Sequence, residues 1–376
     1  MFVALRDLRF ARGRFVLMAT VIVLITYLVV FLASLTEGLA DESTSGVTGL
    51  PADQLAFTVP DDAEPAGPGG GPTFTGSQVT QDQWEAWAQV DGVADAQPLG
   101  IAQTRATSPA TTAAVTAFGL APSSGLLPVP DDGADAVDVA PGTTLLSSGA
   151  ADDLGAEAGD VVRIGDLDLT VTTVLDVDAS YAHTPVLWTS LEDWQSLGAH
   201  LAPDAAPTTV ATVVALTTDL DDDALAAADT DIGTQTESRH AAKSAISSYS
   251  SEHGSLLLME VFLVGISALV VGAFFTVWTI SRSGDIAVLK ALGASTRYLM
   301  RDAIGQALVI LAIGVGLGTF LAAGTAALLS SVAPTVVNAS TVLLPAAVLV
   351  VLGVAGAWLA VLQITRVDPH AALAAR

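Results

Sequence analysis

Residues 15–35 read FVLMATVIVLITYLVVFLASL, 21 positions without a charged side chain. A helix needs about 20 apolar residues to cross a bilayer core about 30 Å thick, so this stretch predicts a transmembrane helix. Three more such runs follow, at residues 256–280, 303–330 and 341–362, and Glu260 is the single charged side chain in all four. The predicted fold class is a membrane protein with four transmembrane α-helices, one plus three, separated by a long polar segment.

The distribution of charge predicts the orientation of these helices. Ten of the 14 Lys and Arg residues flank the apolar runs, whereas residues 36–255 hold the other four with 34 acidic residues, a net charge of −30. Lys and Arg near helix ends are retained on the cytoplasmic side. We therefore expect both termini to be cytoplasmic in a multi-pass plasma-membrane protein, with the acidic segment outside the cell.

These two arguments give a complete segmentation. The predicted spans are residues 15–36, 255–280, 303–330 and 341–363. The cytoplasmic pieces are an amphipathic helix at 1–14, a coupling-helix loop at 281–302 and a tail at 364–376. The extracellular pieces are a domain at 37–254 and a loop at 331–340.

The extracellular domain has mixed α/β patterning. Residues 160–178 alternate apolar and polar positions, and Gly165-Asp166 interrupts them as a hairpin turn would. Strands are also expected at 182–189 and 208–216, and short helices at 82–90, 191–197 and 221–228. Residues 59–73 are rich in Pro and Gly and predict a loop within the domain.

Several function classes are excluded by composition and motif. The chain has no Cys, and its net charge of −25 makes nucleic acid a poor partner. A phosphate-binding P-loop requires Gly-Lys, yet Lys243 follows Ala and Lys290 follows Leu. The sequence therefore predicts a protein that is not itself an enzyme, with no resident metal or cofactor.

Four segments in order resemble the FtsX-like permeases of the type VII (MacB-like) ABC transporters. They are ALRDLRFARGRF (4–15), LGAEAGDVVRIGDLDLTVTTVLDV (154–177), DIAVLKALGAST (285–296) and ITRVDPHAAL (364–373). The resemblance implies a homodimer that works with two copies of a separate cytoplasmic ATPase, which binds ATP and Mg²⁺. It also implies a coupling helix at about 282–299. The residues expected to contact the ATPase there are Arg282, Ile286, Leu289, Lys290, Leu292 and Arg297.

Residues 24–43, LITYLVVFLASLTEGLADES, resemble more narrowly the HrtB-like and DevC-like branch, whose HrtB-like members are haem exporter permeases. This resemblance implies an amphipathic substrate taken from the membrane lipid, with haem as the first candidate. The alternatives are a lipid, peptide or drug exporter, and a non-transporting signal transmitter like the cell-division member of the family. The Ala, Gly and Asp bias suggests a GC-rich Gram-positive bacterium.

Five residues are candidates for substrate binding. Glu260 is a charged group within a span, which is costly and therefore a functional candidate, although it could also reach the outer headgroups. Tyr27 offers a phenol oxygen, a haem-iron ligand type, but a helix–helix hydrogen bond explains it equally well. Met259 could also meet iron or simply fill space, while Tyr249 and His253 lie in the connector before the second span.

Overall fold

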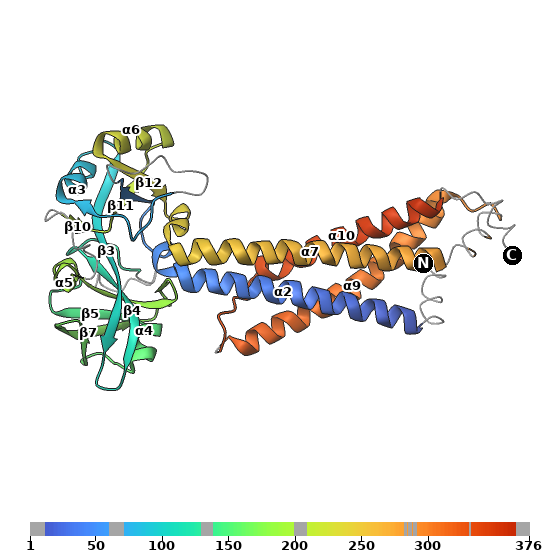
Figure 1. Cartoon of the computed structure of the whole chain (residues 1–376), viewed down its shortest axis with the longest axis horizontal. Helices are drawn as coiled ribbons and strands as arrows, with labels where there is room; N and C mark the ends of the chain where they lie inside the picture. Colours follow the sequence, from blue (N-terminus) through green and yellow to red (C-terminus); the bar gives the residue numbers. More distant parts are fainter. Residues whose placement is uncertain are drawn as a thin grey trace. The chain divides into compact units, whose positions relative to one another are not determined.

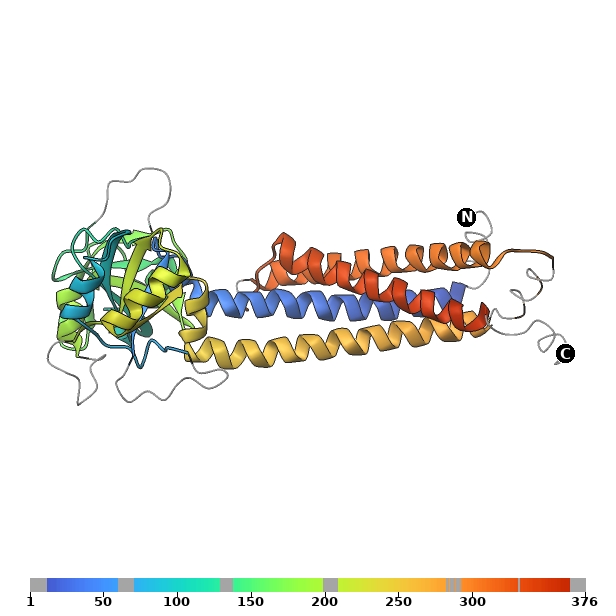
Figure 2. The same cartoon turned by 90° about the horizontal axis from the view of Figure 1, so that it is seen from above.

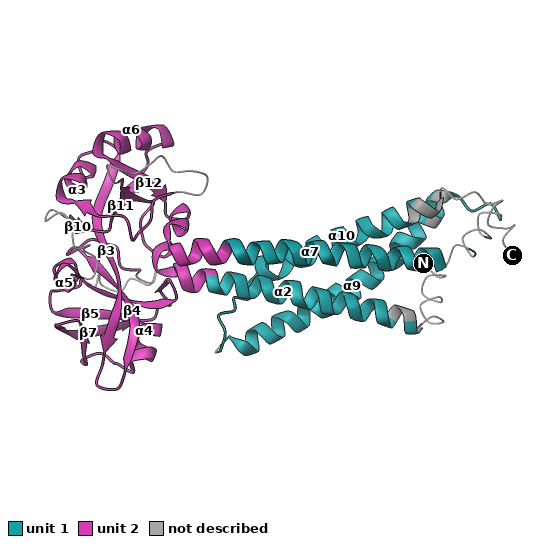
Figure 3. Ribbon diagram, viewed as in Figure 1, with its two compact units in different colours: residues 1–39, 254–376 teal, residues 40–253 magenta. Residues whose placement is uncertain are grey.

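The computed structural model describes residues 12–59, 71–128, 138–198, 209–281, 292–330 and 332–365, with Gly284 and Val288. The chain divides into two compact units (Figure 3). We call residues 1–39 and 254–376 the membrane unit, and residues 40–253 the sheet unit. Each unit is described by itself.

Four long helices carry the apolar runs (Figure 1). They are α2 (Arg12–Thr48), α7 (Ser247–Ser281), α9 (Thr296–Leu329) and α10 (Ala339–Thr365). All four are long and apolar enough to cross a membrane. The four predicted spans are therefore confirmed as helices, and each helix is longer than its apolar run.

The helices of the membrane unit pack around a shared apolar core (Figure 2). Glycines allow close approach at three crossings: Gly314 and Gly318 of α9 meet α2, Gly353 of α10 meets α9, and Gly356 of α10 meets α7. Lipid tails are as apolar as the helices, so such small residues favour association by packing. The core side chains are Met18, Ile22, Val29, Val271, Phe275, Trp278, Ala307, Ile310, Leu311, Val315, Leu349, Ala357 and Ala360.

The sheet unit contains all the strands of the described chain. The strands are β1 (Gln54–Thr58), β2 (Val79–Thr80), β3 (Val93–Thr107), β4 (Thr112–Leu120), β5 (Thr143–Ser147), β6 (Val161–Ile164), β7 (Leu167–Leu175), β8 (Ser180–Tyr181), β9 (Thr184–Ser190), β10 (Thr209–Ala211), β11 (Val213–Thr218) and β12 (Thr234–Ser238). The short helices are α3 (Gln81–Trp87), α4 (Ser148–Leu154), α5 (Leu191–Leu197), α6 (Asp222–Ile232) and the 3₁₀ turn η1 (Ala241–Ala245).

The long strand β3 organises two subsheets. Its first half pairs with β11, which pairs with β1 and then β12. Its second half pairs with β4 on one side and β6 on the other, so the order β3-β4-β9-β5-β7-β6 closes on itself. The closing contact is short, because only Ala106 and Thr107 of β3 pair with β6. The strands β10 and β2 form a separate pair.

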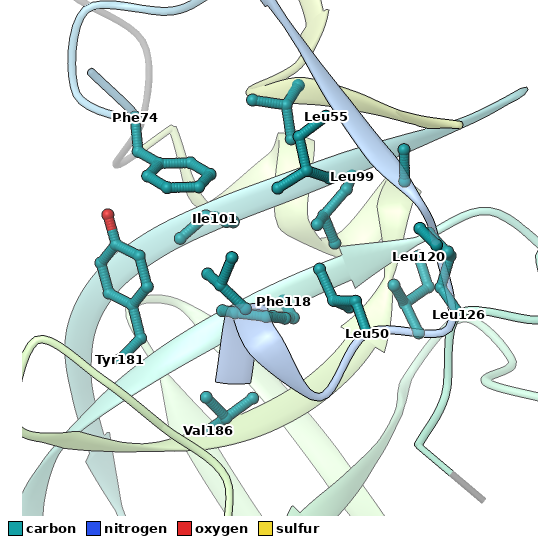
Figure 4. Close-up of a cluster of buried hydrophobic side chains, with 14 of the residues drawn as sticks. Leu50, Leu55, Phe74, Leu99, Ile101, Phe118, Leu120, Leu126, Tyr181 and Val186 are labelled. Atoms are coloured by element: carbon teal, nitrogen blue, oxygen red, sulfur yellow. The ribbon is translucent and has the colours of Figure 1, made fainter. Parts of the chain in front are cut away.

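The end of α2 contributes to the core of the sheet unit. Val47 and Leu50 are buried with side chains from β1, β3, β4 and β9 (Figure 4). Tyr181 packs edge-on against Phe74 and Phe118, with ring centroids 5.7 and 6.2 Å apart. The last turn of α2 is thus part of a folded domain rather than of a span.

Most of the predicted elements of this domain are confirmed. The hairpin at 160–178 forms as β6 and β7, with Gly165 in its turn at a φ of 56°. The helix predicted at 191–197 is α5, and Asp221 caps α6 by accepting a hydrogen bond from the amide of Ala224. Of the loop predicted at 59–73, residues 60–70 lie outside the described chain.

One predicted strand is wrong. Residues 208–216 were expected to form a single strand, but the described part divides into β10 and β11, which belong to different sheets. The break is at Thr212, whose buried hydroxyl accepts a hydrogen bond from the amide of Ile101 at 2.9 Å. The run of Thr, Val and Ala at 208–216 carries no signal for such a side-chain contact.

Candidate functional site around His183

The candidate site is built from the charged ends of α2 and α7. At about 1.5 Å per residue, each helix is longer than 50 Å, against a bilayer core of about 30 Å. The polar residues that end α2 and begin α7, including Glu42 and Glu252, fall in the sheet unit. The surplus length therefore serves the folded domain.

Two hydrogen bonds from backbone amides of β8 and the turn after it hold the last turns of α2. The amide of Ala182 donates to the carbonyl of Ser43 at 2.9 Å, and the amide of Ser180 donates to the hydroxyl of Ser45 at 2.9 Å. Gly46 makes this approach feasible, because a β-carbon there would come within 3.0 Å of the Ser180 carbonyl oxygen. The β8–β9 hairpin is consequently held to α2 at Ser43 and Ser45.

The turn of this hairpin is strained. Tyr181 pairs with Thr184, so Ala182 and His183 alone form the loop, and their φ angles are 47° and 63°. A two-residue loop with both φ values positive is of the type that prefers Asn-Gly, and each left-handed non-glycine residue costs about 1–3 kcal/mol. Such strain is a reason to look for function at these two residues.

The turn places the imidazole of His183 between two carboxylates. Nδ1 lies 3.3 Å from Oε2 of Glu42 on α2, and Nε2 lies 2.8 Å from Oε2 of Glu252 on α7. An ionised carboxylate can only accept hydrogen bonds, whereas an imidazolium donates from both nitrogens. The arrangement therefore suits the doubly protonated ring. A neutral ring would direct a lone pair at one of the two carboxylates.

These three residues do not form a metal site. The two carboxylates approach opposite nitrogens of one ring, so the three groups cannot converge on a single ion. Across the part of the chain that the structure describes, no group of three or more His, Asp or Glu residues could bind a metal. What the arrangement can do is bind a proton and join two helices.

A stacked aromatic pair lies on α7 beside this cluster. The rings of Tyr249 and His253 are 4.9 Å apart and nearly parallel, at 17°. Nζ of Lys243 is 5.8 Å from the centre of the Tyr249 ring. Nδ1 of His253 is buried, and no residue of the described chain bonds to it. Two of the five predicted substrate residues, Tyr249 and His253, are thus brought together.

The other predicted substrate residues are separated. Met259 lies on the exposed face of α7, with 57% of its surface accessible, whereas Glu260 is half-buried on the face that also carries Leu263 and Ser267. Tyr27 is half-buried on α2, where its ring stacks on Phe31 with centroids 5.8 Å apart. Binding through Met259 and Glu260 together would therefore use two different faces of one helix.

Only part of the predicted ATPase contact falls in the described chain. Arg282, Ile286, Leu289 and Lys290 lie outside it. Leu292 is 79% exposed in a turn with Gly293, whose φ is 93°. Ser295 then caps α9 by accepting a hydrogen bond from the amide of Tyr298, and Arg297 is exposed in the first turn.

Sequence reasoning missed Glu42 and His183. They are separated by 141 residues, and His183 by 69 residues from Glu252. One local signal existed: the predicted strand at 182–189 begins with Ala-His, and the short segment before it could have been taken as the first arm of a hairpin. The sequence offered no signal for the identity of the two acidic partners.

Four candidate spans with a sheet-rich unit inserted after the first define an integral membrane protein of the permease class. The chain belongs to the FtsX-like, MacB-like family of ABC transporter permeases. Residues 15–232 match the MacB-like periplasmic core domain, and residues 257–369 match the FtsX-like permease C-terminal domain. The family predicted from the four sequence segments is therefore confirmed.

Curated relatives agree with this assignment. The chain is 29% identical over 141 residues to a Staphylococcus epidermidis protein named hemin transport system permease HrtB, covering 38% of this chain and 40% of that protein. The Staphylococcus haemolyticus protein of that name is 34% identical over 128 residues, covering 34% and 36%. These alignments thus span less than half of the relatives' length. An uncharacterized ABC transporter permease of Mycobacterium tuberculosis is 27% identical over 381 residues, 98% of both chains.

Two solved structures are also similar to this chain. They are the extracellular domain of the ABC-type transporter YknZ from Gram-positive bacteria and the periplasmic region of MacB from Actinobacillus actinomycetemcomitans. The TM-scores are 0.34 and 0.33, with 16% and 10% identity, covering 50% and 54% of this chain and 98% and 95% of those chains.

Proposed function

We propose that this chain is the membrane subunit of an exporter that moves haem, or a similarly amphipathic molecule, out of the membrane. The observation that carries the haem assignment is the similarity to the staphylococcal permeases named for hemin transport. Membership of the ABC permease family supports a partner ATPase. The lack of a Gly-Lys P-loop in the sequence agrees with ATP hydrolysis on that separate subunit.

The complex that we propose has two copies of this chain and two ATPase subunits. The ATPase would contact the segment between α7 and α9 and the first turn of α9, where an apolar side chain, Leu292, and a cation, Arg297, are exposed. An apolar residue exposed beside a cation is suited to a protein interface. Movement there would pass along α7, which ends at this segment, and along α9, which begins there.

As substrate-binding residues we propose Tyr249 and His253 in the sheet unit and, separately, Glu260 and Tyr27 in the membrane unit; Met259 is not included. The stacked rings of Tyr249 and His253 offer a flat aromatic surface. An imidazole nitrogen and a phenol oxygen are both haem-iron ligand types. The half-buried face of α7 that carries Glu260 supports a ligand held among helices rather than in lipid. Met259, on the exposed face, is suited to contact with lipid.

A haem titration of the purified chain in detergent tests the substrate. We expect a saturable shift of the Soret band that Glu260→Ala, Tyr27→Phe or His253→Ala weakens. Met259→Leu is the matched control on the same helix, and we expect it to bind as wild type does. Absence of any Soret shift would contradict haem as substrate and direct the search to lipid, peptide or drug.

The coupling assignment is tested separately with the partner ATPase. Leu292→Asp and Arg297→Glu should lower export while the ATPase remains active. Val332→Ser, at an exposed position after α9, is the control. If both variants export normally, the ATPase contact is elsewhere. If the ATPase is coupled to this chain but nothing is exported, the chain is a signal transmitter of the cell-division type.

A further inference from the structure

Resting on the proposed function, the geometry points to a role for His183 in transmitting the stroke. We propose that protonated His183 is a latch that ties α2 and α7 to each other and to the β8–β9 hairpin, so that helix movement reaches the sheet unit. The residue is a positioning residue: it touches neither ATP nor substrate. Its state would set how tightly hydrolysis and export are coupled.

His183 connects three separate elements of the chain. Glu42 belongs to the helix that carries the first apolar run, and Glu252 belongs to the helix that carries the second. His183 comes from the hairpin and bonds to both. Another side-chain contact between these helix ends, Ser43 Oγ to Ser248 Oγ at 3.3 Å, is uncharged and does not include the hairpin. The imidazole is therefore a charged group that contacts all three elements at once.

The backbone of the turn is strained at both loop residues. Ala182 and His183 both occupy the left-handed region, which Asn and Gly adopt at much lower cost. Stability alone would favour Asn-Gly at these positions. The turn instead carries an imidazole where the side chain meets two carboxylates, so the strain is explained by what the ring does.

The charged groups in contact with the His183 ring are carboxylates. Glu42 and Glu252 face it from α2 and α7; Asp41 is next to Glu42 on α2 and is exposed. On α7, His253 stacks on Tyr249. In its own hairpin Tyr181 is a buried phenol. The cation nearest along the chain to these α7 residues, Lys243, lies over the Tyr249 ring.

Two carboxylates on one imidazole give the latch a pH dependence. An imidazole ordinarily gains its second proton between about pH 5 and 8. Protonated, the ring donates to both carboxylates and the latch is closed. Deprotonated, it can donate to only one, so the connection of α2 to α7 is lost as the pH rises. Coupling should therefore be tighter at pH 5.5 than at pH 8.5.

A distance measurement tests the latch without any substrate. Because the chain has no Cys, spin labels can be placed at Thr48→Cys on α2 and Ser250→Cys on α7. The hydroxyls of these two residues bond only within their own helices, to Thr44 and Ser247. We expect the distribution of distances between the two labels to be narrower at pH 5.5 than at pH 8.5. For half-exposed charged pairs, the ratio of molecules with the latch closed to molecules with the latch open should change about fivefold.

Three variants separate the latch from a merely structural role. His183→Asn tolerates the left-handed backbone but should give the broad distribution at both pH values. His183→Arg, with a permanent charge and several donors, should give the narrow one at both. Ala182→Gly relieves strain and keeps the imidazole, so it should respond to pH as wild type does. If the distance distribution of the His183→Asn variant still becomes narrower at low pH, the latch is disproved.

The link to coupling is tested with the partner ATPase, by measuring ATP hydrolysed per substrate exported at both pH values. We expect the wild-type ratio to rise with pH, and the His183→Asn ratio to be high and unaffected by pH. If the label distances show the latch but the ratio of ATP hydrolysed to substrate exported is the same at both pH values, the role of His183 in coupling is disproved. Because the distance measurement needs no substrate, its result stands apart from the haem assignment.

Discussion

Gly100 of β3 lies directly against the indole of Trp194 from α5: a β-carbon built on this glycine would come within 2.3 Å of the ring. Its register partner on β4 is Gly119, where a β-carbon would approach the Cβ of Trp194 at 2.4 Å. The glycine pair forms a slot for the fully buried side chain that covers it. Packing in this half of the sheet unit depends on that slot.

The first prediction follows from this contact. Gly100→Ala or Gly119→Ala should lower the free energy of unfolding by about 2–3 kcal/mol, since overpacking a close-packed core forces side chains to move. Thermal unfolding of the full chain in detergent measures it. The control is Gly149→Ala in α4, where a β-carbon meets Pro185 at an ordinary 3.4 Å. An equal loss of unfolding free energy in the control variant would show that the slot is unimportant for stability.

The second prediction concerns the crossing of α2 and α9. A β-carbon on Gly314 would lie 2.6 Å from Ile22, and one on Gly318 would lie 2.7 Å from the carbonyl oxygen of Val23. We expect Gly314→Leu and Gly318→Leu to lower the unfolding midpoint in detergent by several degrees. Gly316→Leu is the matched control, because this position on the same helix has open space around it. A similar loss in all three variants would contradict packing as the cause.

Sequence reasoning succeeded where the signal was local. Four uninterrupted apolar runs predicted the spans, and Gly-Asp within an alternating segment predicted the β6–β7 hairpin. It failed for β3 and β4, which were not predicted at all. Their sequences, VADAQPLGIAQTRAT and TAAVTAFGL, are rich in Ala and also contain Gly, and residues of low strand preference give no clear strand pattern. Here the contacts with Trp194 and with neighbouring strands decide the structure.

The candidate site was predictable in part for the same reason. Tyr249 and His253 are four residues apart and stack because a helix brings such positions together. Met259 and Glu260, adjacent in sequence, were grouped as one site, yet neighbouring residues of a helix point in different directions. The partners of His183 come from distant segments, and only the folded chain brings them together.

The third prediction concerns the connection between α9 and α10. A β-carbon on Gly38 would lie 2.1 Å from the carbonyl oxygen of Pro334, and the amide of Val336 donates to the carbonyl of Ser34 at 3.1 Å. Gly38→Ala should therefore displace this connection from α2. Protease cleavage within residues 332–338 should be faster in the variant by several-fold. The control is Gly305→Ala in α9, whose surroundings are open; unchanged cleavage in Gly38→Ala would contradict the contact.

The last prediction uses the buried phenol of Tyr181. Burial raises the pKa of Tyr181 above the ordinary tyrosine value. The unfolded chain loses that proton near pH 10, while the folded chain keeps it, so this contribution is fully present below pH 10 and falls as the pH rises further. We expect wild type to lose stability between about pH 9.5 and 11 more steeply than Tyr181→Phe, whose ring keeps the contacts with Phe74 and Phe118. Urea unfolding at a series of pH values measures the difference, and parallel curves for the two proteins would contradict a buried phenol at this position.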